Sequence, residues 1–149
     1  MFTVYLPAVD EAASAIPLPP PEPARRGSET ILLVEDEELV RALVQRMLQA
    51  AGYCVLVAAN GHDALALAEA ASFDLILTDV VMPHMSGSEL MDRLSDDTPV
   101  LFMSGYTAEL VEQHRVLDGG TNLIQKPFTA VELMRKIREL LDRAAADAA

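Results

Sequence analysis

The sequence contains little cysteine, no tryptophan and no long apolar run. A single cysteine, Cys54, excludes an internal disulfide, and its place in an apolar run predicts that it packs in the core. No stretch approaches the roughly 20 apolar residues that a membrane-spanning helix needs. The first residues also lack the basic flank and apolar core of a secretion signal. We therefore expect a domain of the reducing cytoplasm without direct membrane contact.

Basic side chains are also scarce, with 11 Lys and Arg against 23 Asp and Glu, which gives a net charge of −12. Proteins bind the phosphates of nucleic acids through clustered lysines and arginines, and here these residues are scattered. No nucleic-acid partner is therefore expected. The 149 residues, of which 51% are apolar, suffice for one domain with one buried core.

Prolines divide the chain into segments. Five of the nine prolines lie in residues 8–29, where they alternate with alanines and a few charges. This composition favours an extended linker that forms no core of its own. Residues 30–143 are predicted to form the folded domain, and residues 144–149 an Ala-rich tail.

Within residues 30–143, short apolar runs alternate with segments of helical spacing. The runs predict strands over residues 30–35, 53–58, 73–77, 99–103 and 122–125. Helical spacing predicts a first helix whose apolar face consists of Leu39, Val40, Leu43, Val44, Met47 and Leu48. Further helices are predicted over residues 63–70, 87–94 and 107–117, and a last one begins at the capping-box pair of Thr129 and Glu132.

The regular alternation of strands and helices predicts a parallel sheet covered by helices on both faces. Uninterrupted aliphatic runs are typical of strands that are buried on both sides. The handedness of strand–helix–strand connections leaves few topologies. Five strand–helix pairs then favour an α/β fold of the flavodoxin-like, doubly wound (βα)5 type, with strand order 2-1-3-4-5.

Polar side chains follow four of the predicted strands. Glu35 and Asp36 follow the first, Asp79 the third, Ser104 the fourth and Lys126 the fifth. Ligands of open parallel sheets bind at the carboxyl ends of the strands, because side chains that are distant in sequence meet there. We therefore expect these five residues to share one crevice.

This set of side chains predicts a particular chemistry. Three neighbouring carboxylates repel one another unless a cation intervenes, and hard oxygen ligands select Mg²⁺ or a similar ion. Asp79 is then placed to attack phosphorus and form an aspartyl phosphate. Lys126 and Ser104 would hold the phosphoryl oxygens. The Lys126–Pro127 bond has access to the cis form, which would direct the lysine into the crevice, but the sequence leaves the isomer open.

Four segments, ILLVEDE, LILTDVVMPHMSG, VLFMSGYT and IQKPF, together resemble the motifs of receiver domains of two-component signalling. The resemblance spans residues 30–143. It implies that Asp79 is the phosphoacceptor and that the cofactor is Mg²⁺. Roles for five further residues are implied as well: Glu35 and Asp36 as the acidic metal pair, the backbone carbonyl of Val81 as a metal ligand, Ser104 as the switch hydroxyl, and Lys126 as the phosphate-contacting lysine.

Two positions depart from the family pattern. Leu123 stands where receivers commonly have a Tyr or Phe, so the aromatic ring that usually moves together with the switch hydroxyl is missing at this position. Tyr106 either replaces that ring or belongs to the loop surface. Val81 and Tyr106 flank the expected path of the hydrolytic water, and neither offers a carboxylate or amide. We therefore expect slow loss of the phosphoryl group.

The segment FTVYLPAV near the start of the chain resembles the final strand of a histidine-kinase ATP-binding domain. Residues 1–7 would then be the end of such a domain, and the chain the C-terminal receiver of a hybrid sensor histidine kinase. The alternative is an unrelated tail rich in Pro and Ala. The implied partners are the kinase's phosphohistidine domain, a histidine phosphotransfer protein, or both. The implied place is the cytosolic end of a larger, membrane-anchored sensor.

The leading hypothesis is a phosphorylation switch in which a phosphohistidine gives its phosphoryl group to Asp79. Partner binding would change at the face formed by residues 107–117, residues 122–125 and the last helix. Self-phosphorylation and dephosphorylation fit this chemistry, but the sequence identifies no turnover enzyme. The alternatives are a degenerate receiver that docks without phosphorylation, a metal-dependent aspartyl phosphatase and a flavodoxin-like cofactor binder. The phosphatase would need an acid at Val81, and the acidic run at Glu35 would repel a flavin phosphate.

Overall fold

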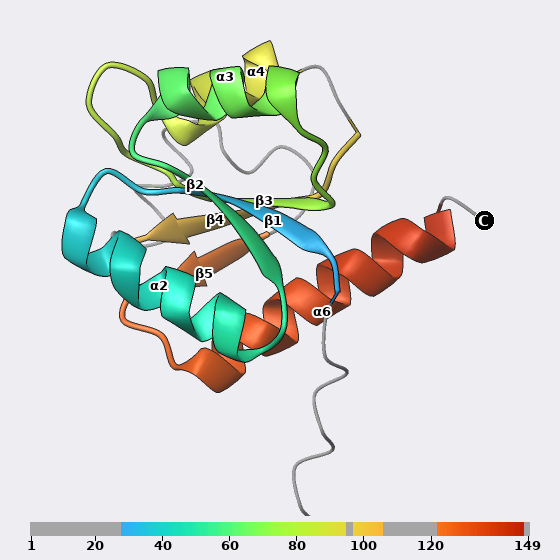
Figure 1. Cartoon of the computed structure of the whole chain (residues 1–149). Helices are drawn as coiled ribbons and strands as arrows, with labels where there is room; N and C mark the ends of the chain where they lie inside the picture. The colour runs from blue at the N-terminus through green and yellow to red at the C-terminus, as the bar shows by residue number, and fades with distance from the viewer. Residues whose placement is uncertain (1–27, 95–96, 106–121, 148–149) are drawn as a thin grey trace, which may run out of the picture.

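The computed structural model describes residues 28–94, 97–105 and 122–147 (Figure 1). Its elements are β1 (Thr30–Val34), α2 (Glu38–Ala50), β2 (Cys54–Ala58), α3 (Gly61–Ala70), β3 (Leu75–Asp79), α4 (Gly87–Arg93), β4 (Val100–Ser104), β5 (Leu123–Gln125) and α6 (Ala130–Asp147). Tyr106 and the helix predicted over residues 107–117 lie outside the described residues.

The five strands form one parallel sheet in the order β2-β1-β3-β4-β5, which confirms the predicted fold class and strand order. Helices α2 and α6 cover one face of this sheet, and α3 and α4 cover the other (Figure 1). Within the part of the chain that the structure describes, no helix combines the length and apolarity needed to cross a bilayer.

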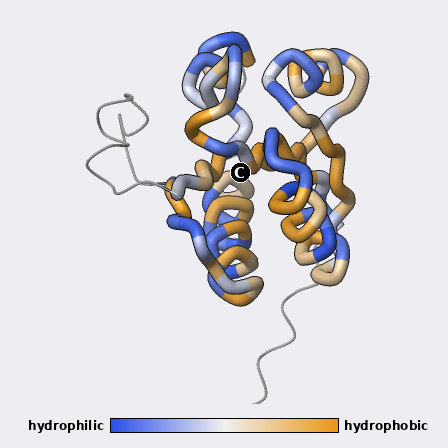
Figure 2. The backbone as a smooth tube through the Cα atoms, turned by 90° about the vertical axis from the view of Figure 1, so that its left-hand side faces the viewer, coloured by the Kyte–Doolittle hydropathy of each residue, from blue (hydrophilic) through white to orange (hydrophobic). Residues whose placement is uncertain are grey.

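The core consists of two apolar clusters, one on each face of the sheet. Ile31 and Leu33 of β1 pack in the cluster under α2 and α6, whereas Leu32 and Val34 pack in the cluster under α3 and α4. This alternation follows from the pleat, because successive side chains of a strand point to opposite faces. All four side chains are 0% exposed. Figure 2 shows the apolar segments concentrated in the sheet between the helices.

The prediction for the buried face of α2 is wrong at two positions. Leu39 is 80% exposed and Leu43 is 55% exposed, whereas Val44 and Leu48 are buried. Each residue of an α-helix is rotated by about 100° from the one before it. Leu39 and Leu43 directly precede the inward-facing Val40 and Val44, so they project to the side of the buried stripe.

Most predicted ends of strands and helices differ from the structure by one or two residues, and some of these differences have a clear physical cause. β3 spans Leu75–Asp79 rather than 73–77, because Asp74 lies just before the strand, where its carboxylate accepts a hydrogen bond from the Thr30 N–H at the amino end of β1. Cys54 is exposed rather than buried, since it begins the edge strand β2. α6 continues through residues 144–147, where the alanine-rich sequence predicts a tail, because alanine has the highest helix propensity.

The start of α6 follows the predicted capping box. The Thr129 N–H donates to the Glu132 carboxylate over 2.7 Å, and the Glu132 N–H donates to the Thr129 hydroxyl over 3.2 Å. The hydrogen bonds from Thr129 hold the pKa of Glu132 below its ordinary value. This cap fixes where the helix begins, and therefore where the chain between β5 and α6 must run.

The chain enters the domain next to the middle of α6. The Glu29 carboxylate pairs with the Arg138 guanidinium at 2.8 Å, and the Glu29 carbonyl accepts from the Cys54 N–H at 3.0 Å. Arg138 also pairs with Asp142 one turn further along the helix. The hydrogen bond from Arg138 holds the pKa of Glu29 below its ordinary value. The entry point therefore lies at the amino ends of the strands, tied to the last helix.

Gly87 at the start of α4 lies against the end of β3. A Cβ atom at this position would lie 2.5 Å from the backbone oxygen of Asp79 and 3.3 Å from the ring of Phe102. The Gly87 N–H also donates to the Val80 carbonyl over 3.0 Å. Because a backbone atom in a paired strand cannot move aside cheaply, only glycine fits here.

We predict that Gly87→Ala lowers the free energy of unfolding by about 1–3 kcal/mol, because the added methyl group must push α4 away from β3. Urea denaturation measures this change. Gly105→Ala is the matched control, since a Cβ there would have no atom of the described residues within 4 Å. Equal effects of the two substitutions would contradict this account of Gly87.

Candidate functional site

The carboxyl ends of the strands bring the predicted side chains together. Asp79 is the last residue of β3 and Ser104 the last of β4, while Glu35 and Lys126 directly follow β1 and β5. One carboxylate oxygen from each of Glu35, Asp36 and Asp79 lies within 4.8 Å of the other two. The three carboxylates therefore lie close together at the carboxyl ends of the strands, and the chemical roles of the five residues stay predictions.

Lys126 bridges two of the carboxylates. Its Nζ atom lies 2.8 Å from Glu35 Oε2 and 3.1 Å from Asp79 Oδ2. The Lys126 backbone N–H donates to the Ser104 carbonyl over 2.7 Å, which continues the pairing of β4 and β5 past their ends. The Lys126–Pro127 bond, which the sequence left open, is cis. The Lys126 ammonium thus links the carboxyl ends of β1, β3 and β5.

Glu35 is the buried member of the acidic group, at 1% exposure. Its Oε1 atom accepts from the Glu37 N–H over 3.1 Å, and its Oε2 atom accepts from Lys126. Burial raises the pKa of Glu35 above its ordinary value, although the hydrogen bonds from Lys126 and Glu37 oppose this effect. The nearby charge of Asp79 raises it further. Both oxygens of this side chain are therefore fixed by the protein.

The same contacts act on Lys126. Burial alone would lower the pKa of its ammonium, but the carboxylates of Glu35 and Asp79 outweigh burial, so the pKa lies above its ordinary value. An ammonium group whose pKa is already basic and is raised further stays charged at neutral pH. Lys126 is therefore a fixed positive charge beside the carboxylates.

Asp79 remains reachable from solvent, because its side chain is 14% exposed. Oδ2 accepts from Lys126, and Oδ1 lies 3.4 Å from the Val81 N–H. Its backbone oxygen accepts from the hydroxyl of the buried Thr78 over 3.1 Å. The backbone of Asp79 is thus held by a buried side chain of the sheet, while its carboxylate is partly accessible to solvent.

The donor set fits a hard divalent cation. Three carboxylates around one ammonium leave an excess of negative charge, and carboxylate oxygens with a backbone carbonyl are the ligands that Mg²⁺ takes. Asp36 is exposed and Glu35 is buried, so the group opens toward solvent on the Asp36 side. The backbone carbonyl of Val81, two residues after Asp79, stays a predicted ligand.

The residues predicted to form the switch are only partly described. Ser104 is 1% exposed at the end of β4. Leu123, partly buried, pairs with Phe102 in the sheet, so an aliphatic side chain occupies the position where receivers commonly have an aromatic one. Tyr106 lies outside the described residues, and its part in the switch stays a prediction.

Sequence reasoning missed Arg41. Its Nη1 atom donates to the backbone carbonyls of Glu35 and Asp36, at 2.9 Å and 3.4 Å. No pattern of residue types predicts a contact between a side chain and backbone carbonyls. Only the spacing could have indicated it, because helical side chains point toward the helix N-terminus and Arg41 lies in the first turn of α2.

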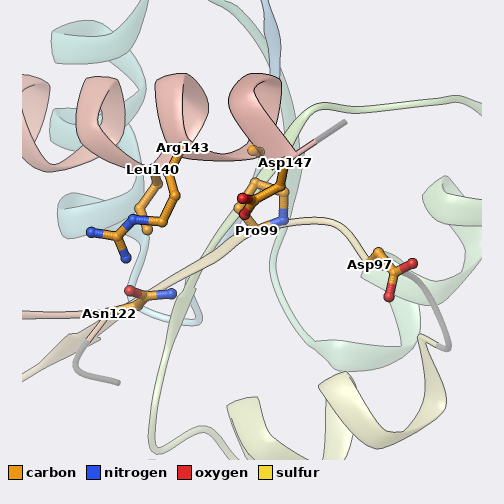
Figure 3. A pocket seen from close by; sticks show the side chains of 7 residues that line it. Asp97, Pro99, Asn122, Leu140, Arg143 and Asp147 are labelled. Atoms are coloured by element: carbon orange, nitrogen blue, oxygen red, sulfur yellow. The ribbon is translucent and has the colours of Figure 1, made fainter. Parts of the chain in front are cut away.

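The cavity in Figure 3 is a separate feature. Its lining comes from the segments before β4 and β5 and from the C-terminal half of α6, at the opposite end of the strands from Asp79. The lining residues are Asp97, Pro99, Asn122, Leu140, Arg143, Ala144 and Asp147. It takes no part in the acidic group.

Two curated sensor kinases resemble the chain over most of its length. Over 95% of the chain, the sequence is 33% identical to the sensor kinase CckA of Brucella abortus, of which 16% is covered. Over 82% of the chain, it is 37% identical to the autoinducer 1 sensor kinase/phosphatase LuxN of Vibrio campbellii, of which 15% is covered. The chain therefore spans about a sixth of the length of these relatives.

Solved structures of receiver domains and of a chemotaxis protein are also similar to the chain. The receiver domain of the hybrid histidine kinase CckA superposes with a TM-score of 0.63 and 36% identity, over 75% of this chain and 98% of that one. The chemotaxis protein CheY4 of Vibrio cholerae superposes with a TM-score of 0.68 and 34% identity, over 76% of this chain and 99% of that one. Residues 31–138 also match the family model of the response regulator receiver domain. The chain therefore belongs to the receiver-domain family of two-component signalling.

Proposed function

We propose that this receiver domain accepts a phosphoryl group from a phosphohistidine onto Asp79 in the presence of Mg²⁺. The observation that carries the proposal is the setting of the Asp79 carboxylate. It is 14% exposed, lies 3.1 Å from the Lys126 ammonium, and belongs to a group of three carboxylates. A nucleophilic carboxylate needs this combination of access and neighbouring positive charge.

In the transfer step, a carboxylate oxygen of Asp79 forms a bond to phosphorus while the N–P bond of the donor phosphohistidine breaks. The imidazole leaves with the electron pair of that bond and then takes up a proton. The Val81 N–H and the Lys126 ammonium orient the two Asp79 oxygens before attack. Lys126 then faces the negative charge on the transferred group.

The residues that would hold Mg²⁺ are Glu35, Asp36 and Asp79, with the backbone carbonyl of Val81. When bound, the ion supplies positive charge beside the phosphoryl oxygens, which reduces their repulsion with the attacking carboxylate. Glu35 is already anchored by Lys126 and by the Glu37 N–H. The exposed Asp36 therefore offers the carboxylate with the most freedom to meet a cation, because the Asp79 oxygens are also contacted by Lys126 and the Val81 N–H.

Phosphorylation would change partner binding. The phosphoryl group on Asp79 would carry about 1.5 to 2 negative charges in place of the single charge of the carboxylate, within reach of groups at the ends of β4 and β5. Lys126 and Ser104 are linked through their backbones, so a movement of one is transmitted to the other. We propose that the response reaches partners through β5, α6 and residues 107–117. Because Leu123 replaces the usual ring, Tyr106 is our candidate for the aromatic element of this switch.

The comparison with CckA supports an origin in a hybrid kinase. An alignment over 95% of this chain necessarily includes part of residues 1–29, which precede the receiver match at residues 31–138. We propose that residues 1–7 end a kinase ATP-binding domain, that residues 8–29 are the linker, and that the receiver works at the cytosolic end of a sensor. Its partners would be the kinase's phosphohistidine domain and a histidine phosphotransfer protein.

The exposed leucines of α2 offer a docking contact for the donor. A phosphohistidine must reach bonding distance of Asp79, so its carrier has to rest on the elements that surround the acidic group. α2 begins at Glu38, two residues after Asp36, and presents Leu39 and Leu43 to solvent. Exposed apolar side chains next to a reaction centre are typical of a binding surface.

The alternatives receive less support. A docking module independent of phosphorylation would not require Lys126 between Glu35 and Asp79. An aspartyl phosphatase would need an acid at Val81, whose apolar side chain is 41% exposed beside Asp79.

Asp79→Asn should abolish phosphorylation. With Mg²⁺ and acetyl phosphate, the wild-type chain should gain one labile phosphoryl group by intact mass, because Asp79 alone among the described residues has the required setting. The variant, and the wild type in excess chelator, should gain none. Asp92→Asn, which removes an exposed carboxylate from α4, is the control and should be labelled like the wild type. Labelling of Asp79→Asn at the wild-type rate would disprove the assignment.

Replacement of both Leu39 and Leu43 by alanine should slow transfer from a phosphohistidine donor about tenfold, since an apolar docking contact is lost. The rate of labelling by acetyl phosphate should not change, because the reacting groups are intact. Glu69→Ala on α3, at the other face of the sheet, serves as the control. An equal loss with both donors would show that the leucines act on folding or on the site itself.

Val81→Asn should shorten the half-life of the aspartyl phosphate about tenfold, because its amide can orient the hydrolytic water that the valine cannot. The decay of the labelled protein by intact mass measures this rate. Val81→Ala supplies the comparison, since it shortens the side chain without adding a polar group. If Val81→Asn and the wild type lose the group equally slowly, another residue controls hydrolysis.

A further inference from the structure

Arg41 connects helix α2 to the loop that carries two of the acidic residues. It lies in the first turn of the helix, and its side chain reaches back past Glu37. Nη1 lies 2.9 Å from the Glu35 carbonyl oxygen and 3.4 Å from that of Asp36. Because the guanidinium is charged, these hydrogen bonds are stronger than those between neutral groups.

The two carbonyls belong to the residues whose carboxylates would hold the cation. Glu35 has other anchors, since its N–H donates to the Ala58 carbonyl and its carboxylate is bound by Lys126 and the Glu37 N–H. Asp36 is exposed, so packing does little to fix its backbone. The contact from Arg41 therefore bears most on the direction in which Asp36 projects.

The charge and the hydrogen bonds of Arg41 are expected to have opposite effects on the binding of a cation. A guanidinium close to a cation site repels the incoming ion, so as a bare charge it would weaken binding. Its hydrogen bonds have the opposite effect, because they hold the carboxylate-bearing loop in one geometry before the ion arrives. Groups that orient metal ligands commonly change metal affinity by 10–100-fold.

We propose that Arg41 is a positioning residue for the divalent cation, acting through the carbonyls of Glu35 and Asp36. The inference rests on the proposed function, because it assumes that this acidic group binds Mg²⁺. It assigns to Arg41 no contact with the phosphoryl group or with the ion.

The test is the affinity of the full chain for Mg²⁺, measured by isothermal titration calorimetry. Arg41→Gln should weaken binding about tenfold, and Arg41→Met should do the same while keeping an apolar stem against the helix. Arg41→Lys should keep most of the affinity, since its ammonium can donate to the same carbonyls. Arg46→Gln, an exposed arginine of the same helix, should bind as the wild type or slightly more tightly.

The direction of the change decides between the two effects of Arg41. If Arg41→Gln and Arg41→Met bind Mg²⁺ as tightly as the wild type, or more tightly, the arginine acts as a charge and the proposal is overturned. Thermal unfolding without Mg²⁺ gives a second readout. A lower Tm with unchanged Mg²⁺ affinity would reduce Arg41 to a structural residue and overturn the proposal as well.

The same titrations separate this inference from the function on which it rests. If the wild type binds Mg²⁺ and Asp79→Asn binds it more weakly, the site is present, and only the Arg41 variants decide the inference. If the wild type takes up no Mg²⁺, the proposed function and the role of Arg41 fail together.

Discussion

The position of the Lys126 ammonium between the carboxylates of Glu35 and Asp79 is the constraint on which the rest of the site depends. Two acidic groups at the ends of adjacent strands repel each other, and the burial of Glu35 makes its ionised form more costly. Lys126 offsets both effects from the end of a third strand. One side chain thereby holds the ends of β1, β3 and β5 in the geometry that a metal and a phosphoryl group would require.

Most of the fold could be predicted because buried parallel strands leave a plain signal in the sequence. The runs around Ile31 and Leu77 have aliphatic side chains on both faces of the strand. This pattern is typical of a sheet that helices cover on both sides. The predictions were wrong where one side of an element is open to solvent. Leu39, Leu43 and Cys54 have apolar side chains but are exposed. The residue type alone does not distinguish such exposed apolar side chains from buried ones.

Part of the candidate site could likewise be predicted from the sequence, and part could not. The proximity of Glu35, Asp79 and Lys126 follows from chain order, because parallel strands end at a common edge. Arg41 and Gly87 could not be predicted on these grounds, since both act on backbone atoms. Arg41 donates to backbone carbonyl oxygens, and Gly87, which has no Cβ, leaves space for the backbone oxygen of Asp79. Contacts of this kind depend on the path of the main chain, which is known only once the elements have been placed.

The Glu29–Arg138 pair has a consequence for how the domain would work inside a larger protein. It fixes the entry of the chain at the amino ends of the strands, whereas Asp79 lies at their carboxyl ends. A tether attached through residues before Glu29 would therefore leave from the side opposite the reaction centre. The proposed attachment and the proposed phosphoryl transfer would then use different surfaces, and a donor could approach Asp79 while the domain stayed joined to a neighbour.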